Sequence, residues 1–316
     1  MTRVCIIGCG SIGSLYAAHL ARVAEVWAFV RRPEHARALN EHGLHVTGGH
    51  EFHASVRAAH HPADLPASFD LGIVSCKATQ TAEALGPVAQ FFEKGAILSS
   101  QNGLGAEEII AGLSKTFVIR GTTFMSGSRL SDTEVRYALD TPTWMGPFEP
   151  TKTPYALVRQ AADLLVAGGL KAEALSDARP AQWSKLIFNS SVNAVAALTE
   201  LPHTVHYAQE KQFADLGHLL HDLVEEGKRV ASARGVKLYE DPWHMNKVGA
   251  LTNHPPSMLY DIRNKLRTEV DFLGGAIARE AQKAGIPAPL HTALYRLVKA
   301  KEASWTFEGE ERTATM

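Results

Sequence analysis

The sequence has little of what marks secreted, membrane-bound or nucleic-acid-binding proteins. It contains only three cysteines, Cys5, Cys9 and Cys76, and no Cys-x-x-Cys pair, which argues against a disulfide framework and indicates a reducing compartment such as the cytoplasm. No hydrophobic run approaches the length of a membrane span, and the apolar segment that begins at Val4 stops at Gly8, too short for a signal peptide. The formal net charge of −1 creates no field that would attract nucleic acid or an anionic membrane.

The chain is long enough for two domains, and its two parts differ in pattern. It has 316 residues, of which 45% are hydrophobic and 21% charged, ordinary values for a globular enzyme. Short apolar runs alternate with helical segments up to about Asp177, which predicts a parallel sheet with right-handed crossovers. Long helical stretches follow. We therefore predict an α/β domain over residues 1–177, an all-α domain over 178–305 and a polar, frayed tail over 306–316.

The expected elements follow from periodicity and from turn residues. In the first domain they are strand 4–7, helix 15–24, strand 25–30, helix 36–42 closed by Gly43, strand 71–76, helix 79–92, strand 96–99, helix 106–113, strands 118–126, 134–139 and 143–146, helix 155–166 and strand 172–175. In the second domain we expect helical stretches over 180–198, 213–234, 257–284 and 291–303.

A Gly-x-Gly-x-x-Gly motif directly follows the first strand and opens the first helix. It reads Gly8-Cys9-Gly10-Ser11-Ile12-Gly13. Gly8 permits the tight turn, Gly10 lets the backbone approach a pyrophosphate, and Gly13 lets the helix pack closely on the strand. The helix N-terminus at Ser11 and Ile12 offers N–H groups and a positive dipole to phosphates. This context predicts a Rossmann-type dinucleotide-binding domain; the alternative is a purely structural glycine turn.

The end of the second strand indicates which dinucleotide binds. Enzymes that use NAD usually carry an acid there, which binds the ribose 2′-hydroxyl. This chain instead has Val30-Arg31-Arg32. A guanidinium has a planar fork that suits a 2′-phosphate. The cofactor is therefore predicted to be NADPH, unless the two arginines are merely solvated surface residues.

Three polar residues recur along one stripe of the first helix of the second domain. Lys185, Asn189 and Asn193 are spaced i, i+4, i+8, which places them on one face in steps of roughly 6 Å. Asparagine is a mediocre helix former, so two in register on a largely apolar helix need a reason. A lysine beside two carboxamides suits a partly buried polar site, in which burial would lower the lysine pKa and ease proton donation to a carbonyl oxygen. The alternative is a polar surface stripe.

From about Thr2 to Ala303 the sequence resembles the ketopantoate reductase (2-dehydropantoate 2-reductase) family. The motifs that carry the resemblance are the glycine motif, Ser75-Cys76-Lys77, Gln101-Asn102-Gly103, the Lys185/Asn189/Asn193 helix, Pro256-Ser257-Met258-Leu259-Tyr260-Asp261 and Thr268-Glu269-Val270-Asp271. The resemblance implies a Rossmann-type domain, an α-helical C-terminal domain and an active site in the cleft between them. It also implies NADPH-dependent reduction of ketopantoate to pantoate, a step of pantothenate biosynthesis.

The resemblance assigns roles to residues of the second domain. Lys185 would be the general acid on the carbonyl oxygen, and Glu269 would anchor the substrate or Lys185. Asn189 and Asn193 would contact substrate oxygens, and Ser257 the carboxylate.

It also assigns roles around the cofactor. Arg31 would bind the 2′-phosphate, Lys77 would lie close to the cofactor, and Asn102 would lie near both the nicotinamide and the substrate. The spacing of residues does not identify four of these positions, which follow from the resemblance alone: Lys77, Asn102, Ser257 and Glu269.

One segment departs from the family pattern. Many members carry a Pro-Asn-Gly segment with a substrate-contacting asparagine, where this chain has Leu201-Pro202-His203-Thr204. Because histidine is larger and can carry charge, a different branched or dicarboxylic 2-oxo acid is an alternative substrate.

Two further functions are compatible with a Rossmann-type domain. One is that of an NAD-dependent 3-hydroxy acid dehydrogenase, which should carry an acid where Arg31 stands, and the second is that of a non-catalytic NADPH sensor. Two histidine pairs at i, i+3 spacing, His203/His206 and His218/His221, could hold a metal, but hydride transfer needs none and we expect none. A homodimer is compatible with the sequence.

Overall fold

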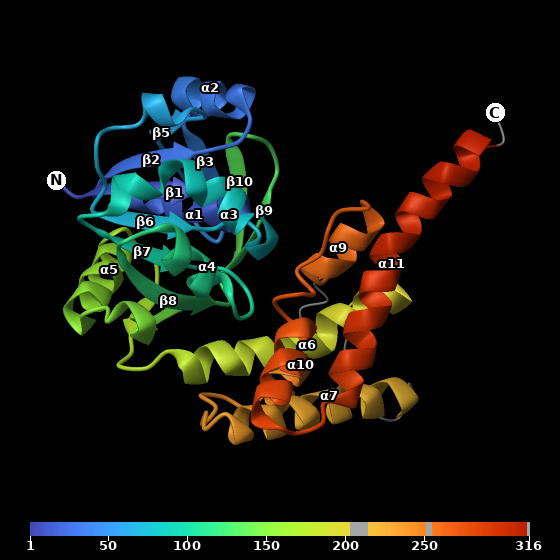
Figure 1. The fold of residues 1–316 in the computed structure, drawn as a ribbon. Helices are drawn as coiled ribbons and strands as arrows, with labels where there is room; N and C mark the ends of the chain where they lie inside the picture. Colours follow the sequence, from blue (N-terminus) through green and yellow to red (C-terminus); the bar gives the residue numbers. More distant parts are fainter. Residues whose placement is uncertain (203–213, 251–254, 315–316) are drawn as a thin grey trace. The chain divides into compact units, whose positions relative to one another are not determined.

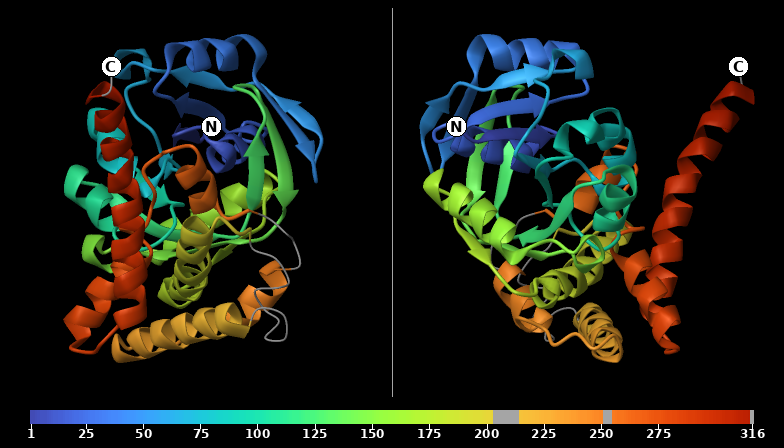
Figure 2. Two further views of the ribbon diagram at one scale, coloured as in Figure 1. Left: turned by 90° about the vertical axis from the view of Figure 1, so that its right-hand side faces the viewer. Right: turned by 60° about the vertical axis from the view of Figure 1, so that its left-hand side comes forward.

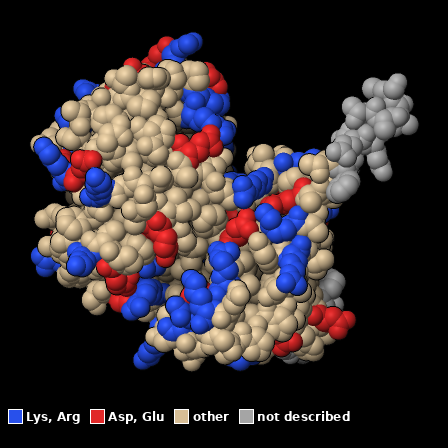
Figure 3. Space-filling view, in the orientation of Figure 1, with Lys and Arg blue, Asp and Glu red and all other residues tan. Residues whose placement is uncertain are grey.

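The computed structural model describes residues 1–202, 214–250 and 255–314, and the chain divides into two compact units. The N-terminal unit consists of Met1–Gln101 and Ala106–Arg179, and the C-terminal unit of Asn102–Gly105 and Pro180–Met316. Both units carry acidic and basic side chains on the face drawn in Figure 3. Among the described residues no helix is long and apolar enough to cross a membrane.

The N-terminal unit is built on an eight-stranded sheet in the order β12-β11-β8-β7-β6-β1-β2-β5 (Figure 1). All neighbouring strands are parallel except β8 and β11, which are antiparallel. The strands are β1 (Arg3–Ile7), β2 (Glu25–Phe29), β5 (Arg57–Ala59), β6 (Leu71–Val74), β7 (Ala96–Ser99), β8 (Phe117–Thr123), β11 (Thr143–Pro147) and β12 (Ala172–Ala174).

The central strands β6 and β7, and β1 after Arg3, are buried because helices cover both faces of the sheet. Along β1, Val4 and Ile6 belong to one hydrophobic core, and Cys5 and Ile7 to the other. The first core contains residues of α1 (Ser11–Leu20), α2 (Pro33–His42) and α5 (Tyr155–Ala167); the second contains residues of α3 (Thr81–Leu85) and α4 (Ala106–Leu113). This confirms the predicted Rossmann-type architecture.

One predicted helix of this unit is wrong. Residues 79–92 form three short pieces, η2 (Ala78–Gln80), α3 and η3 (Gly86–Phe92), and not one helix. Pro87 lies in this segment and lacks the N–H that a continuous helix requires, so the chain tightens into a 3₁₀ turn there. Two further 3₁₀ turns are η1 (Pro62–Asp64) and η4 (Glu149–Thr151).

A second, four-stranded sheet was only partly predicted. Its order is β4-β3-β10-β9, and the green β9 and β10 lie beside the blue β3/β4 hairpin in Figure 2. Its strands are β3 (Leu44–Gly48), β4 (Phe52–Ala54), β9 (Ser126–Arg129) and β10 (Glu134–Leu139). The expected strand 118–126 is in fact β8 and the start of β9, each in a different sheet. In β3 only two apolar residues, Leu44 and Val46, face inward, too short a pattern to detect.

Every regular element in the described part of the C-terminal unit is a helix, as predicted. Its helices are α6 (Arg179–Thr199), α7 (Ala214–Ala233), α8 (Pro242–Ala250), α9 (Ser257–Arg263), α10 (Gly274–Ala284) and α11 (Pro289–Ala314). Helix α6 packs on α7 at Gly227, where a Cβ atom would lie 2.8 Å from the Ile187 side chain. A small residue at this position therefore sets how closely the two helices approach.

Three expectations for this unit need correction. The stretch 257–284 is two helices, α9 and α10, separated by a turned segment in which Lys265 has a φ of 51°. Helix α8 was not expected. Helix α11 continues through Ala314, where the sequence predicted a frayed tail.

A buried polar cluster joins three helices of this unit. The Glu226 carboxylate of α7 accepts hydrogen bonds from the backbone N–H of Leu290 (3.1 Å) and of His291 (2.8 Å) at the start of α11, and from His291 Nδ1 (2.9 Å). The other ring nitrogen of His291 lies 3.1 Å from Ser190 Oγ of α6. All three side chains are buried. Hydrogen bonds from the backbone and the imidazole hold the Glu226 pKa below its usual value, although burial opposes them.

We expect Glu226→Gln to lower the free energy of unfolding by about 2 kcal/mol at neutral pH, because the amide N–H₂ would face a backbone N–H or the imidazole N–H. Denaturant unfolding measures this. Because the Glu226 pKa is depressed in the folded state, the stabilisation is present above the carboxyl's unfolded pKa and fades as the pH falls below it. Asp222→Asn, on the exposed face of α7, is the control, and equal effects of the two variants would contradict the expectation.

Candidate functional site

In the glycine turn after β1, Gly8 and Gly13 lie close to other backbone atoms, whereas Gly10 has no atom near it on the side where a Cβ would be. Gly8 has a φ of +91°, and a Cβ there would lie 2.8 Å from the Cys76 backbone nitrogen. A Cβ on Gly13 would lie 2.0 Å from Gly8 O. At Gly10, in contrast, an added Cβ would meet no atom within 4 Å. The backbone at Gly10 therefore faces open space, as a closely approaching pyrophosphate requires.

Helix α1 presents its N-terminus at this turn. It begins at Ser11, has Gly10 as N-cap with no side-chain cap, and carries no acidic residue in its first turn. The first N–H groups of a helix have no partner within it, so those of the first turn, Ile12 among them, can bind an anion. Ser11 Oγ accepts a hydrogen bond from the backbone N–H of Arg129 (3.1 Å). These residues fit the pyrophosphate of a dinucleotide.

The other candidate cofactor residues of the N-terminal unit follow β2 and β6, the two parallel strands on either side of β1, at the same edge of the sheet. Arg31 lies just after β2, and its side chain is exposed. Arg32 forms ion pairs with Glu34 (3.0 Å) and with Asp132. Lys77, after β6, is half-buried. Ligands of open α/β sheets bind beyond the carboxyl ends of the strands, which is where these residues lie.

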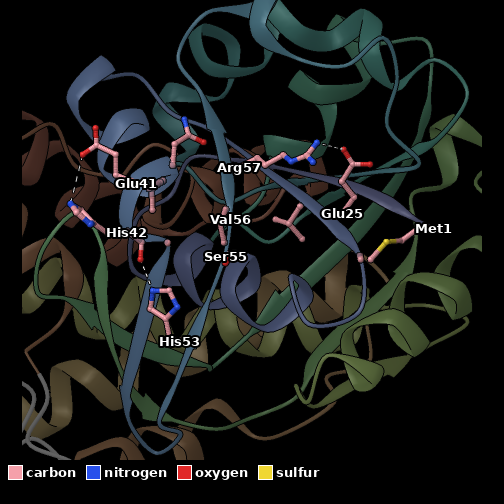
Figure 4. A pocket seen from close by; sticks show the side chains of 13 residues that line it. Met1, Glu25, Glu41, His42, His53, Ser55, Val56 and Arg57 are labelled. Carbon is pink, nitrogen blue, oxygen red and sulfur yellow. Dashed lines mark hydrogen bonds and ion pairs between the residues drawn. The ribbon is translucent and has the colours of Figure 1, made fainter.

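A cavity of about 440 Å³ lies at the opposite end of β2 (Figure 4). Glu25, Glu41, His42, His53 and Arg57 contribute its charged and imidazole groups. Because Glu25 begins β2 and Arg57 begins β5, this cavity is at the amino ends of the strands. It therefore does not belong to the dinucleotide site.

In the C-terminal unit, the stripe on α6 combines a half-buried lysine with two asparagines. Burial lowers the pKa of Lys185 from 10.5 to about 8, and the nearby Glu269 carboxylate opposes that shift. Glu269 itself is buried and lies in the turned segment before α10. The fold thus brings together these two residues, which lie 84 positions apart in the sequence.

Asn193 joins the stripe to the start of α9. Its side-chain N–H₂ donates to Asn189 O (3.0 Å), and its oxygen accepts from the backbone N–H of Met258 (3.4 Å). Its side chain is only 5% exposed. Ser257, the first residue of α9, is exposed. Asn193 therefore serves to hold the end of α9 that carries Ser257.

The segment that carries Asn102 packs against the segment that carries Glu269. Leu104 N–H donates to Phe272 O (3.0 Å), and Gln182 donates to Gly103 O (3.0 Å). A Cβ on Gly103, which has a φ of +89°, would lie 2.0 Å from Phe272 O, so only glycine fits. The half-buried Asn102 is thus held beside the turn that follows Glu269.

Several residues fall outside these groups. His203 and His206 lie outside the described residues. Within the described ranges, no three His, Cys, Asp or Glu side chains are arranged to hold a metal. The sequence alone did not identify Arg129 and Asp132, which contact Ser11 of α1 and Arg32 after β2, respectively. No local pattern marks these two residues, since each contacts a partner about a hundred positions away in the sequence.

Comparison with known proteins agrees with both units. The family described as ketopantoate reductase PanE/ApbA matches residues 4–150, and its C-terminal family matches residues 177–302. The chain is similar to 2-dehydropantoate 2-reductase of Pyrococcus abyssi (28% identity, covering 95% of this chain and 98% of the relative) and of Escherichia coli O157:H7 (26%, covering 96% of each).

Solved structures show the same fold. A PanE/ApbA family ketopantoate reductase from Ralstonia eutropha JMP134 has a TM-score of 0.83 and 26% identity, covering 96% of this chain and 99% of that one. D-mandelate dehydrogenase in a ternary structure with NADH and anilino(oxo)acetate has a TM-score of 0.85 and 24% identity over the same shares. The chain is therefore an oxidoreductase that belongs to the ketopantoate reductase family, a family of dinucleotide-dependent reductases, as its sequence motifs predicted.

Proposed function

We propose that the protein reduces the carbonyl group of ketopantoate to the alcohol with NADPH, and that Lys185 is the general acid. The observation that carries this proposal is the pairing of the half-buried Lys185, whose pKa is lowered to about 8, with the buried Glu269. The names of the relatives favour ketopantoate as substrate. The absence of disulfides among the three cysteines favours the cytoplasm; a homodimer stays a prediction.

NADPH, when bound, supplies the hydride that adds to the carbonyl carbon. The residues of the C-terminal unit do the rest. Lys185 Nζ donates a proton to the carbonyl oxygen as negative charge develops there. The Glu269 carboxylate stabilises the ammonium and so favours protonated Lys185. Asn102, Asn189 and Ser257 bind substrate oxygens, and Asn193 orients Ser257.

The carboxyl end of β2 favours NADPH. The exposed Arg31 offers a guanidinium for the 2′-phosphate, and Lys77 adds a second cation at the same edge of the sheet. Gly10 and the first turn of α1 take the pyrophosphate. His203, in place of the family asparagine, leaves a different branched or dicarboxylic 2-oxo acid as the rival substrate.

The purified protein should therefore oxidise NADPH with ketopantoate faster than with other branched or dicarboxylic 2-oxo acids, and Lys185→Ala should lower kcat by roughly 10²-fold or more. Absorbance at the NADPH band follows the reaction. NADPH binding to the variant should persist, because the glycine turn and Arg31 lie in the other unit. Lys237→Ala, at an exposed position of the C-terminal unit, is the matched control. Near-normal turnover of Lys185→Ala would remove Lys185 from the mechanism.

The pH dependence tests the same residue. Because reduction requires protonated Lys185, kcat/KM at saturating NADPH should be constant below about pH 8 and fall tenfold per pH unit above it. Glu269 raises the Lys185 pKa, so Glu269→Gln should move this fall to lower pH. A fall at unchanged pH in that variant would show that another group titrates.

Cofactor preference tests Arg31. Arg31→Ala should raise the Kd of NADPH by about tenfold or more, because it removes charge-assisted hydrogen bonds to the 2′-phosphate. The Kd of NADH should be nearly unchanged, because NADH lacks this phosphate. Titration of the cofactor fluorescence measures both constants. Arg37→Ala, exposed on α2, is the control. Equal affinity of the unmodified protein for the two cofactors would refute the proposed preference.

A further inference from the structure

The turn between β9 and β10 brings a carboxylate to the carboxyl end of β2. Asp132 Oδ1 accepts hydrogen bonds from Arg32, which directly follows Arg31, and from Arg129 (3.1 Å). One carboxylate oxygen thus bridges two guanidinium groups. The three side chains are only partly exposed, 28% for Asp132, 40% for Arg32 and 37% for Arg129.

Hydrogen bonds fix this turn relative to the glycine turn. The backbone N–H of Arg129 donates to Ser11 Oγ at the start of α1. Within the turn, Leu130 N–H donates to Glu134 O (2.9 Å), and Thr133 N–H donates to Ser131 Oγ (3.2 Å). Strand β9 also packs on α1. The position of Asp132 is therefore set by the same helix that would hold the pyrophosphate.

The arginines at this edge of the sheet differ in the number of ion pairs that they form. Arg32 pairs with two carboxylates, Asp132 and Glu34, and Arg129 pairs with Asp132. In the described ranges, the guanidinium of Arg31 has no ion pair. Burial lowers the pKa of the neighbouring His35, against a smaller opposing effect of Asp132, so this imidazole is neutral at neutral pH and does not offset the Asp132 charge.

This arrangement changes how the end of β2 recognises a cofactor. The sequence of β2 lacks the acid that accepts the ribose 2′-hydroxyl in NAD enzymes, but the second sheet supplies a carboxylate at the same edge. A carboxylate repels a 2′-phosphate, and it also holds two guanidinium groups that could otherwise bind that phosphate.

We propose that Asp132 is a specificity-determining residue for the cofactor, which weakens binding of the 2′-phosphate by its charge and by engaging Arg32 and Arg129. Arg31 then carries most of the 2′-phosphate recognition. The preference for NADPH over NADH is consequently smaller than three arginines at this edge would produce. This inference rests on the proposed placement of the adenosine ribose at the end of β2.

The test is Asp132→Asn, which keeps the size of the side chain and removes its charge. Calorimetric titration of the full-length protein should give a Kd for NADPH and for 2′,5′-ADP that is lower by roughly fivefold, from the loss of repulsion and the release of two guanidinium groups. The Kd of NADH and of ADP, which lack the 2′-phosphate, should change by less than about twofold. Asp163→Asn, exposed on α5, removes a charge elsewhere in the unit and should change none of them.

The outcomes separate this inference from the proposed function. Equal changes for ligands with and without the 2′-phosphate, no change, or weaker NADPH binding would overturn it; the last would show that Asp132 orients Arg32 for the phosphate. In the Arg32→Ala background the gain from Asp132→Asn should shrink. If instead Arg31→Ala leaves NADPH binding unaffected while Asp132→Asn acts as expected, the role proposed for Arg31 fails and that of Asp132 stands.

Discussion

The N-terminal unit depends on one close contact, the approach of helix α1 to strand β1 at the glycine turn. A Cβ at Gly13 would lie 2.0 Å from Gly8 O, so the helix can pack on the strand only with glycine at this position. That contact places the first turn of α1 at the carboxyl edge of the sheet. Through Ser11 it also fixes the turn that carries Arg129, and with it Asp132. The backbone geometry of two glycines thus determines where charged side chains from a different sheet lie.

In the C-terminal unit, too, a close backbone contact and buried hydrogen bonds fix the positions of neighbouring segments. Gly103 packs its backbone against Phe272 O, and Asn193 connects α6 to the start of α9. The Glu226–His291 pair holds α7 against the start of α11, and its partner Ser190 lies next to Asn189 in the stripe on α6. The residues proposed to bind substrate are therefore supported by buried polar contacts that the sequence pattern does not reveal. Such supporting contacts keep a polar site in one geometry.

What could be predicted from the sequence was local. The glycine motif and the Lys185 stripe both depend on spacings of a few residues. The glycine motif, together with the alternation of strands and helices, predicted the fold class correctly, and the stripe predicted a partly buried polar site. Pro87 indicates a break within residues 79–92, but the helical spacing of the residues around it predicted one continuous helix. The strand β3 and the approach of Asp132 to Arg32 were not predictable, because β3 has only two inward-facing apolar residues and the contact joins residues 100 positions apart. The resemblance to a known family, and not any spacing, identified Glu269 as the partner of Lys185.

In the proposed mechanism, the Lys185–Glu269 pair meets two opposing requirements of a proton donor. The pKa of a lysine exposed to water is too high for an effective acid near neutral pH. Full burial without an anionic partner would lower the pKa so far that the lysine would lose its proton. Burial of Lys185 lowers its pKa, and Glu269 limits that shift, so the value settles near 8. At neutral pH the ammonium form then predominates, yet it is acidic enough to transfer its proton as the carbonyl oxygen gains charge. The same pKa sets the pH above which the proposed reduction slows, because less of the lysine is then protonated.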